Sequence, residues 1–487
     1  MTQLKHIWSV LFLFVAFAVL ESCSVNPVTG KRQLAISEQK ELEMGAAYDP
    51  QVVAQYGLYQ DQELQQFIET RGKEMAAVSE RPNLPWSFKV VDSPVVNAFA
   101  VPGGYVYFTR GIMAHFNNEA QFAGVLGHEI GHVTARHTAN QIAKQQVYQG
   151  ALIGGMILSS DVAQNAQLAS QGLGLLFLKF GRDAERQSDR LGVKYSTTVG
   201  YDATEMAGFF KTLESLSGGP EGGIPNFVST HPNPGERYET VLQLAQQAKA
   251  KAPNKNYEVD RRDYLQMIDG IVYGEDPRGG YVENNNFYHP ELKFQFPVPN
   301  GWQYQNSPSQ FIMAEPNGRG QAVLQLAQGA TSPEQAAQAF VQQNQLQVTG
   351  SQNITMSGLN ATVTEAVVST QAQQGQPAQQ IGVLAYHIAY GDLIYRMYGL
   401  SSAQNYTGLR QTFVNVFGNF KPLNDPDKLN RQPMRLRIRQ VPSAMSFQQA
   451  MQQFGQDGSK MQELAILNGK NPNDQLAAGS YIKTIGN

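Results

Sequence analysis

An apolar pattern at helical spacing begins near residue 118. Asn118 and Glu119 provide a helix start signal, and the apolar positions after them recur at helical spacing. These positions are Phe122, Val125, Leu126, Ile130 and Val133. The pattern predicts a helix with one face in a hydrophobic core, so polar groups beside that face are expected at the edge of the core.

Alternating patterns predict strands on both sides of this helix. Residues 97–108 have the pattern of a strand, a Pro-Gly-Gly turn and a second strand. The C-terminal half adds a strand, a hairpin and two helices, expected at residues 292–298, at 381–400, from Ser332 onward and at about 408–420.

Length and composition indicate several domains. The chain has 487 residues, enough for about three domains, and past about Asn284 it shifts towards Gln and Asn with few charges. The net charge of -3, from 37 basic and 40 acidic residues, comes without a dense basic run, so no nucleic-acid partner is expected. We expect a leader followed by three domains, at residues 1–22, 23–283, 284–425 and 426–487.

The N-terminal residues have the pattern of an export signal. Lys5 precedes an apolar run at residues 7–20, which is short for a membrane span but typical of a signal peptide. The run ends in Leu20-Glu21-Ser22-Cys23, and this single cysteine allows no disulfide within one chain. The segment resembles a bacterial lipobox, which implies lipid attachment at Cys23, and Ser24 resembles the sorting signal for the outer membrane. The alternative is an ordinary signal peptide cleaved elsewhere.

The predicted helix carries two histidines with metal-ligand spacing. His128 and His132 are four positions apart with Glu129 between them. Residues at this spacing differ by only about 40° around a helix, so both imidazoles can bind one ion. A catalytic zinc keeps three protein ligands and lowers the pKa of a bound water to about 7, and Glu129 is close enough to polarise that water. The motif predicts hydrolysis, most often of peptide bonds. The alternative is a surface helix with two solvated histidines, against which the apolar face argues.

A third ligand is expected from another element. Glu185 and Asp189 are also four residues apart, so on a helix they face the same way. One of them can bind zinc while the other accepts an imidazole N–H from a ligand. Taken alone, residues 182–192 are more typical of a charged, solvated helix face; paired with the histidine motif, they favour a metal site.

Together these motifs resemble one family of peptidases. His-Glu-x-x-His at 128–132, Glu-x-x-x-Asp about fifty residues later and Asn-Ala-Phe-Ala at 97–100 are similar to the gluzincins that include HtpX, BepA and the CAAX prenyl endoprotease, peptidase family forty-eight. The resemblance covers residues 24–260 and implies a mostly helical, zincin-like metalloprotease domain. The implied site is one zinc on His128, His132 and Glu185, with Glu129 as general base and then proton donor, and Asp189 hydrogen-bonded to a ligand.

The resemblance also gives meaning to two further segments. It implies that an edge strand with Asn97, Ala98, Phe99 and Ala100 binds substrate as an added strand, although a plain core hairpin is equally compatible with these residues. Residues 229–237 resemble the family's Ser-Thr-His-Pro loop, so His231 is expected near the zinc, with Arg237 fixing the loop. Two roles stay open for His231, a reversible fourth ligand that blocks water or a donor to the developing oxyanion. The alternative is an ordinary turn residue.

Other features near the motif are interpreted as structural. His137 lies five residues after His132, which rotates it by about 140° on a continuous helix, so it is not expected to be a ligand. Residues 150–158 and 172–180 are apolar, but polar residues between them interrupt the run, so neither is expected to span a bilayer. They predict a buried helical hairpin or a mobile lid over the cleft.

The last two domains resemble small modules without a catalytic motif. Residues 284–425 are similar to a PsbP/Mog-like domain, on a Phe-x-Phe-Pro-x-Pro-x-Gly-Trp start and a late hairpin followed by a helix. Residues 426–487 are similar to a LysM module, which implies contact with peptidoglycan, although Ser443-Ala444-Met445 replaces the usual Gly-Asp-Thr. The predicted fold class is α+β, with a helical gluzincin domain, an α+β sandwich and a small LysM-like domain.

The sequence therefore predicts a zinc endopeptidase that is lipid-anchored in the outer membrane and faces the periplasm. Its expected substrates are unfolded or misassembled envelope proteins. Two other classes remain as alternatives: a mainly noncatalytic envelope chaperone in which His231 keeps the zinc closed, and a peptidoglycan-associated structural lipoprotein. Glu129 favours the enzyme, because a pure binding protein has no need of that carboxylate.

Overall fold

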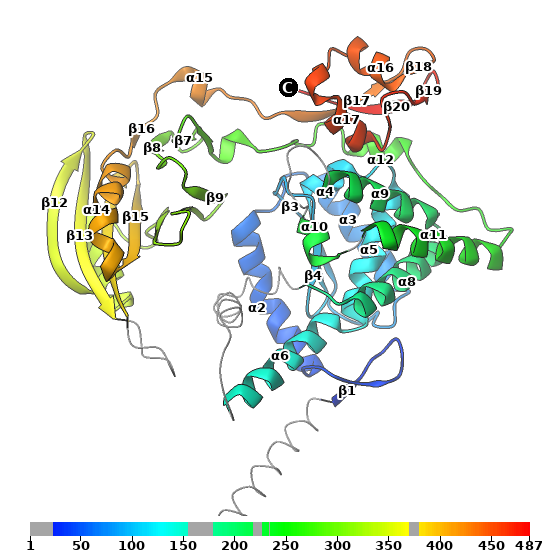
Figure 1. The fold of residues 1–487 in the computed structure, drawn as a ribbon, viewed down its shortest axis with the longest axis horizontal. Coiled ribbons are helices and arrows are strands. Elements are labelled where there is room, and N and C mark those ends of the chain that lie inside the picture. The colour runs from blue at the N-terminus through cyan, green and yellow to red at the C-terminus, as the bar shows by residue number, and fades with distance from the viewer. Residues whose placement is uncertain (1–22, 154–178, 218–225, 233, 370–378) are drawn as a thin grey trace, which may run out of the picture. The chain divides into compact units, whose positions relative to one another are not determined.

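The computed structural model describes residues 23–153, 179–217, 226–232, 234–369 and 379–487. The chain folds into two compact units (Figure 1). The first unit combines Met1–Gly274 with Met434–Asn487, and the second is the segment between them, Glu275–Pro433. Both contain helices and sheets, as the predicted α+β class requires. The predicted signal peptide at residues 1–22 lies outside the described residues.

The first unit is mainly helical and contains a small three-stranded sheet. β3 (Ser87–Val91) runs parallel to β5 (Tyr105–Thr109), and β4 (Ala98–Val101) pairs antiparallel with β5. The hairpin predicted at residues 97–108 is therefore present, with β4 as an edge strand. The other elements up to Gly274 are β1 (Cys23–Val25), β2 (Arg32–Leu34), α2 (Glu38–Tyr56), α3 (Gln62–Ala76), α4 (Arg110–His115), α5 (Glu119–Thr134), α6 (His137–Ile153), α8 (Arg182–Val199), α9 (Thr204–Ser217), α10 (Asn226–Thr230), α11 (Pro234–Lys251) and α12 (Arg262–Met267).

Helix α5 forms the centre of this unit. It begins where predicted, because the Asn118 side chain accepts a hydrogen bond from the backbone N–H of Gln121 at 2.8 Å. All 16 of its residues are buried, whereas the sequence pattern predicted only one buried face. The helix ends at Thr134, and two residues later Arg136 takes up the left-handed backbone conformation with φ 61°.

Helices α5 and α8 approach closely because glycines line their contact. A Cβ atom on Gly192 of α8 would lie 3.1 Å from the carbonyl oxygen of Gly124 and 3.2 Å from the backbone nitrogen of His128. A Cβ atom on Gly127 of α5 would lie 3.0 Å from the Cα of Gly192. The absence of side chains at these positions lets the first turns of α8 lie alongside His128.

The C-terminal residues share the hydrophobic core of the first unit. β17 (Arg435–Gln440) pairs antiparallel with β20 (Tyr481–Gly486), and the Nζ of the fully buried Lys483 donates to the carbonyl oxygens of Ala114 at 2.8 Å and Phe116 at 2.6 Å. Of the module predicted at 426–487, residues 434–487 thus belong to the first unit, and the LysM-like assignment stays a prediction. Its other elements are β18 (Met445–Ser446), α16 (Phe447–Gln453), α17 (Met461–Asn468) and β19 (Gln475–Leu476).

The second unit is a seven-stranded antiparallel sheet with a helix on each face. Val383 and Ala385 pack against Phe340 of α13 (Pro333–Gln343), while the alternate residues Leu384 and Tyr386 pack in the cluster with α14 (Ala403–Phe417). The strand order is β12 (Gln347–Met356), β13 (Leu359–Ser369), β14 (Gln380–Tyr390), β15 (Leu393–Ser402), β11 (Gly320–Leu326), β10 (Gln310–Ala314) and β9 (Gln303–Ser307). A four-stranded sheet adds β16 (Lys421–Pro422), β8 (Phe294–Pro297), β7 (Asn286–His289) and β6 (Tyr281–Glu283), and α15 (Pro426–Leu429) follows.

Candidate metal centre

Helix α5 brings three of the predicted site residues together in the core. His128 and Glu129 are each 1% exposed and His132 is 2% exposed. The four-residue spacing sets the two imidazoles edge to face, with ring centroids 4.7 Å apart and Nε2 atoms 3.0 Å apart. Two ring nitrogens this close suit a shared proton or a shared cation.

Helix α8 supplies two carboxylates, and they face different atoms of the imidazoles. Glu185 lies beside the Nε2 atoms, with its carboxylate oxygens 3.5 Å from His132 Nε2 and 3.6 Å from His128 Nε2. Asp189 instead lies 3.0 Å from His128 Nδ1. Of the two carboxylates that the spacing left open, Glu185 is therefore among the candidate ligand atoms, and Asp189 is positioned to accept an imidazole N–H.

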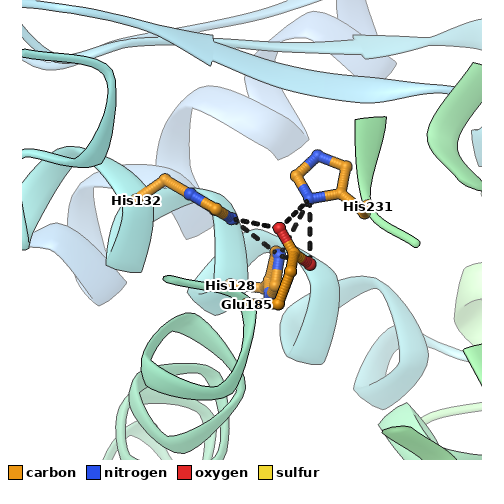
Figure 2. A group of neighbouring side chains, drawn as sticks. All are labelled: His128, His132, Glu185 and His231. Carbon is orange, nitrogen blue, oxygen red and sulfur yellow. Dashed lines mark hydrogen bonds and ion pairs between the residues drawn. The ribbon is translucent and has the colours of Figure 1, made fainter. Parts of the chain in front are cut away.

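His231, directly after α10, completes a cluster of four donor side chains (Figure 2). Its Nδ1 is 3.0 Å from Glu185 Oε1 and 3.3 Å from His128 Nε2. One donor atom from each of His128, His132, Glu185 and His231 lies within 4.8 Å of all the others, and all four residues are buried. Ligands of a tetrahedral zinc at ~2.1 Å lie about 3.4 Å from one another, so the donor set fits such an ion.

Glu129 has an oxygen that the rest of the site leaves unsatisfied. Among the described residues, its Oε1 is buried without a hydrogen-bond partner, and His231 Nε2 lies 3.7 Å away. A buried carboxylate oxygen without a partner carries a large desolvation cost, so such an atom commonly marks a site for water or a ligand. The four donors fit a metal ion, and the orphaned oxygen marks a place for a water or ligand beside it once a coordination position is open.

The electrostatics of the cluster favour the protonation states that metal ligands need. Burial lowers the pKa of His132 well below its ordinary value, so its imidazole is neutral. Burial alone would raise the pKa of Glu185, but the charges of His231 and Arg237 outweigh it and lower the pKa well below the ordinary range. Burial raises the pKa of Glu129, which suits a group that accepts and releases a proton.

Arg237 ties the His231 loop to helix α8. Its guanidinium donates to both oxygens of Asp189, at 2.9 and 2.6 Å, and lies 3.0 Å from Glu185 Oε2. It also donates to the carbonyl oxygen of His231 at 3.4 Å. The loop contact expected from the sequence is thus present, and the same group balances two buried carboxylates.

The predicted substrate-binding residues lie at and before the edge strand β4. Ala98, Phe99 and Ala100 belong to β4, and Asn97 directly precedes it with its Oδ1 buried and unpartnered among the described residues. The backbone N–H of Phe227, in the helix before His231, donates to the carbonyl oxygen of Val96 at 3.3 Å. Helix α10 is therefore hydrogen-bonded to the segment that leads into the edge strand.

The geometry can be set against known proteins. Residues 62–245 match the family model described as Peptidase family M48. That segment contains all four donors, Glu129, Asp189, Arg237 and strand β4. The cluster thus lies in the segment of the chain that is similar to the M48 peptidases.

Two curated relatives illustrate the similarity. The chain is 31% identical over 270 residues to a beta-barrel assembly-enhancing protease of Yersinia pestis, covering 53% of this chain and 52% of the relative. It is 32% identical over 183 residues to the mitochondrial metalloendopeptidase OMA1 of Arabidopsis thaliana, covering 38% of this chain and 36% of the relative. The chain thus spans about half or less of the length of these relatives.

The second unit has no assignment of comparable strength. A cyanobacterial PsbP from Synechocystis has 11% sequence identity and a TM-score of 0.23, covering 28% of this chain and 91% of that protein. A TM-score this low assigns no fold. The PsbP/Mog-like resemblance of residues 284–425 therefore stays a prediction.

No sequence motif pointed to the aromatic side chains around the candidate metal centre. The Phe180 ring lies 4.1 Å, centroid to centroid, from that of His132, and the Phe227 ring stacks on His231 at 4.5 Å. The backbone N–H of Phe180 also donates to the carbonyl oxygen of Thr230 at 3.2 Å. No motif distinguishes these residues, because each appears in the sequence as one more apolar position.

The apolar segments that precede helix α8 are described only in part. Most of residues 150–158 and 172–180, for which a helical hairpin or a lid was predicted, fall outside the described residues. Within the part of the chain that is described, no helix combines the length and apolarity needed to cross a membrane.

Proposed function

We propose that the chain is a zinc-dependent endopeptidase of the bacterial envelope that hydrolyses unfolded or misassembled envelope proteins. The observation that carries this proposal is the buried four-donor cluster with the unpartnered Glu129 oxygen beside it. The match of residues 62–245 to Peptidase family M48 supports the reaction. The printed name of the Yersinia relative, a beta-barrel assembly-enhancing protease, supports the choice of substrates.

The residues of the site divide the chemistry among them. Zinc, held by His128, His132 and Glu185, would supply a Lewis acid that activates water. Glu129 accepts the proton of the attacking water and then donates it to the leaving amine, a double role for which a raised pKa is favourable. Asp189 holds the imidazole of His128 in place through its Nδ1.

Substrate binding is assigned to the edge strand. An extended peptide that pairs with the open edge of β4 gains main-chain hydrogen bonds without a requirement for particular side chains. Such binding suits a protease for unfolded proteins, whose common property is exposed backbone rather than a shared sequence. Asn97 and residues 98–100 would line this strand-addition site.

In this proposal the position of His231 decides whether the site is open and active or closed. As a fourth protein donor it fills the position that water needs, so the arrangement of Figure 2 corresponds to a closed site. A noncatalytic chaperone with a permanently closed site is the rival function that this residue favours. The presence of Glu129 beside the cluster supports the peptidase over that rival function.

Anchoring completes the proposal. Lipid attachment at Cys23 would hold the protein at the outer membrane, facing the periplasm, because several acyl chains on one cysteine give a stable anchor. Strand β1 begins at this cysteine, so the folded domain would start at the membrane surface. The LysM-like residues 426–487 would add a possible contact with peptidoglycan.

The decisive experiment measures zinc content and casein digestion in the same preparations. His128→Ala, His132→Ala and Glu185→Ala are expected to lose zinc, whereas Glu129→Gln keeps zinc and loses activity by about 10²-fold or more, because only the proton acceptor is removed. Glu365→Gln in the second unit is the matched control and leaves both unchanged. Full activity of Glu129→Gln would refute the enzyme mechanism, and full zinc occupancy of Glu185→Ala would move the third ligand elsewhere.

A further inference from the structure

The two ligand histidines of helix α5 are held in different ways. Each has its Nε2 directed at the donor cluster, so each needs a partner for the N–H on its Nδ1. His128 has the charged carboxylate of Asp189 at 3.0 Å. Among the described residues no carboxylate contacts the Nδ1 of His132; this atom lies 3.1 Å from Nδ1 of His137.

His137 reaches this position because helix α5 ends before it. On a continuous helix its side chain would be rotated away from His132, as the sequence analysis assumed. Instead, the left-handed conformation of Arg136 turns the chain back. The Arg136 guanidinium is held by Glu41 at 2.5 Å and by the carbonyl oxygen of Ile36 at 2.6 Å, so the turn is fixed by buried polar contacts.

The second nitrogen of His137 fixes which way the hydrogen bonds run. His137 Nε2 lies 3.1 Å from Gln187 Oε1, which can only accept. His137 must therefore carry its proton on Nε2, which leaves Nδ1 as an acceptor for the N–H of His132. Ser188 Oγ, 3.3 Å from the same Nδ1, can donate or accept and so does not oppose this direction.

We infer that His137 is a positioning residue for the metal: it accepts the Nδ1–H of His132 and donates its own Nε2–H to Gln187, which orients His132 as a ligand. The relay is neutral, in contrast to the carboxylate partner of His128. It rests on the proposed zinc site. Helix α8 then supplies, within five residues, the ligand Glu185, the final acceptor Gln187 of the relay from His132, and the partner Asp189 of His128.

Three changes at and beside His137 separate positioning from simple packing. In His137→Asn the amide oxygen can take the place of Nδ1 as acceptor, whereas His137→Leu keeps the bulk and removes the acceptor. Gln187→Glu, at a half-buried position, replaces the final acceptor with a charged one and should strengthen the relay. His115→Leu is the matched control, because His115 is also buried but bonds to the carbonyl oxygen of Gly111 rather than to a ligand.

The readout is zinc affinity by competition with a chelator, together with the thermal midpoint of the metal-free protein. We expect His137→Leu to weaken zinc about 10- to 100-fold, His137→Asn to restore most of the loss, and Gln187→Glu to bind zinc more tightly than the native protein. His115→Leu changes the midpoint but not the affinity.

Other results would overturn the inference. Equal zinc affinity in His137→Leu, His137→Asn and the native protein would remove the positioning role while leaving the zinc peptidase intact. If His137→Leu does not fold, an unchanged affinity in Gln187→Glu refutes the relay instead. A native protein that binds no zinc would refute the proposed function and the relay together, whereas loss of activity in Glu129→Gln without any effect at His137 separates the two.

Discussion

At the scale of single residues, two histidines of the site lie a few ångströms apart but have their pKa values shifted in opposite directions. The rings of His132 and His231 are 5.1 Å apart, centroid to centroid. Burial lowers the pKa of His132, whereas His231, although burial acts on it too, has its pKa raised by the carboxylates of Glu185 and Glu129. The contact of His231 with the cluster therefore depends on charge balance as well as on position.

We expect His231→Ala to raise proteolysis of loosely folded proteins without loss of zinc. Truncation removes the fourth donor and opens the water position, while His128, His132 and Glu185 still hold the metal. Digestion of casein and of a short peptide, with zinc analysis, checks this. If His231 instead donates to the oxyanion, activity should fall by ~10²-fold, and unchanged activity on both substrates would leave His231 as a turn residue.

His387 in the second unit predicts a pH-dependent stability. It is fully buried, and burial together with the charge of Arg396 lowers its pKa to about 3. Below pH 6.5 the unfolded chain binds a proton that the folded chain does not bind, so the free energy of unfolding falls as the pH decreases from about 6.5 towards 3, by roughly 4 kcal/mol in all. Above pH 6.5 His387 is neutral in both the folded and the unfolded chain, so this loss of stability is absent.

The variant His387→Gln tests this dependence. Arg396 Nε donates to His387 Nε2 at 3.0 Å, and a glutamine oxygen can accept the same bond without titrating. With Trp86→Phe and residues 1–22 removed, the fluorescence of Trp302 reports the second unit. We expect a shallower loss of stability on acidification in His387→Gln; identical pH profiles would assign the loss to other groups.

Single residues also mark how far the sequence predicts the site. His128, Glu129 and His132 follow from spacing on one helix, since that spacing fixes their geometry locally. The contact of His137 with His132 does not follow from spacing, because the angle between two side chains can be calculated from their spacing only while both lie on one continuous helix. The left-handed conformation of Arg136 separates the two residues onto different helices. Its side chain is held by Glu41, which is far away in the sequence.

At the scale of elements, the crossing of α5 and α8 decides whether Glu185 reaches the histidines. The sequence pattern predicted both helices but assigned no role to their glycines. In the structure Gly127 and Gly192 are buried at the crossing, where their lack of a side chain allows the close approach. The residue pattern of one helix gives no information about which other elements pack on it, so the full burial of α5 was not predictable.

We expect Gly192→Ala to weaken zinc binding and lower the thermal midpoint. The new Cβ would press on two backbone atoms, Gly124 O at 3.1 Å and His128 N at 3.2 Å, which can yield only if the helices separate. Gly208→Ala on α9 is the control, because its Cβ would have no neighbour closer than 3.6 Å and the change gains up to ~1 kcal/mol of helix propensity. Equal gains in stability for both variants would contradict a crossing limited by packing.

At the scale of the whole molecule, the chain leaves the first unit and returns to it. The second unit begins at Glu275, a few residues before the composition shift at about Asn284. Nothing in composition indicates the return, because contacts between segments far apart in sequence leave no local pattern. The return is made by hydrogen bonds such as Tyr273 N–H to Met434 O at 2.8 Å and Leu436 N–H to Ile271 O at 2.9 Å.

This topology predicts opposite outcomes for two deletions. Replacing Glu275–Pro433 by a Gly-Gly linker should leave zinc binding and casein digestion intact, because the adjacent Tyr273 and Met434 let a short linker close the gap. Ending the chain at Pro433 should destabilise the first unit, because it exposes the core around Leu436 and removes the Lys483 donor from the carbonyl oxygens of Ala114 and Phe116, shortly before α5.

Zinc content, casein digestion and the thermal midpoint of both deletion proteins, compared with the full chain, check this prediction. Lys483→Met in the full chain measures the contribution of the Lys483 hydrogen bonds alone. The methionine keeps the buried stem but leaves the carbonyl oxygens of Ala114 and Phe116 without that donor, so the thermal midpoint should fall. If the protein that ends at Pro433 is as stable as the full chain, residues 434–487 form an independent module. In that case the shared core contributes little to the peptidase, and the LysM-like segment is free to act as a separate binding domain.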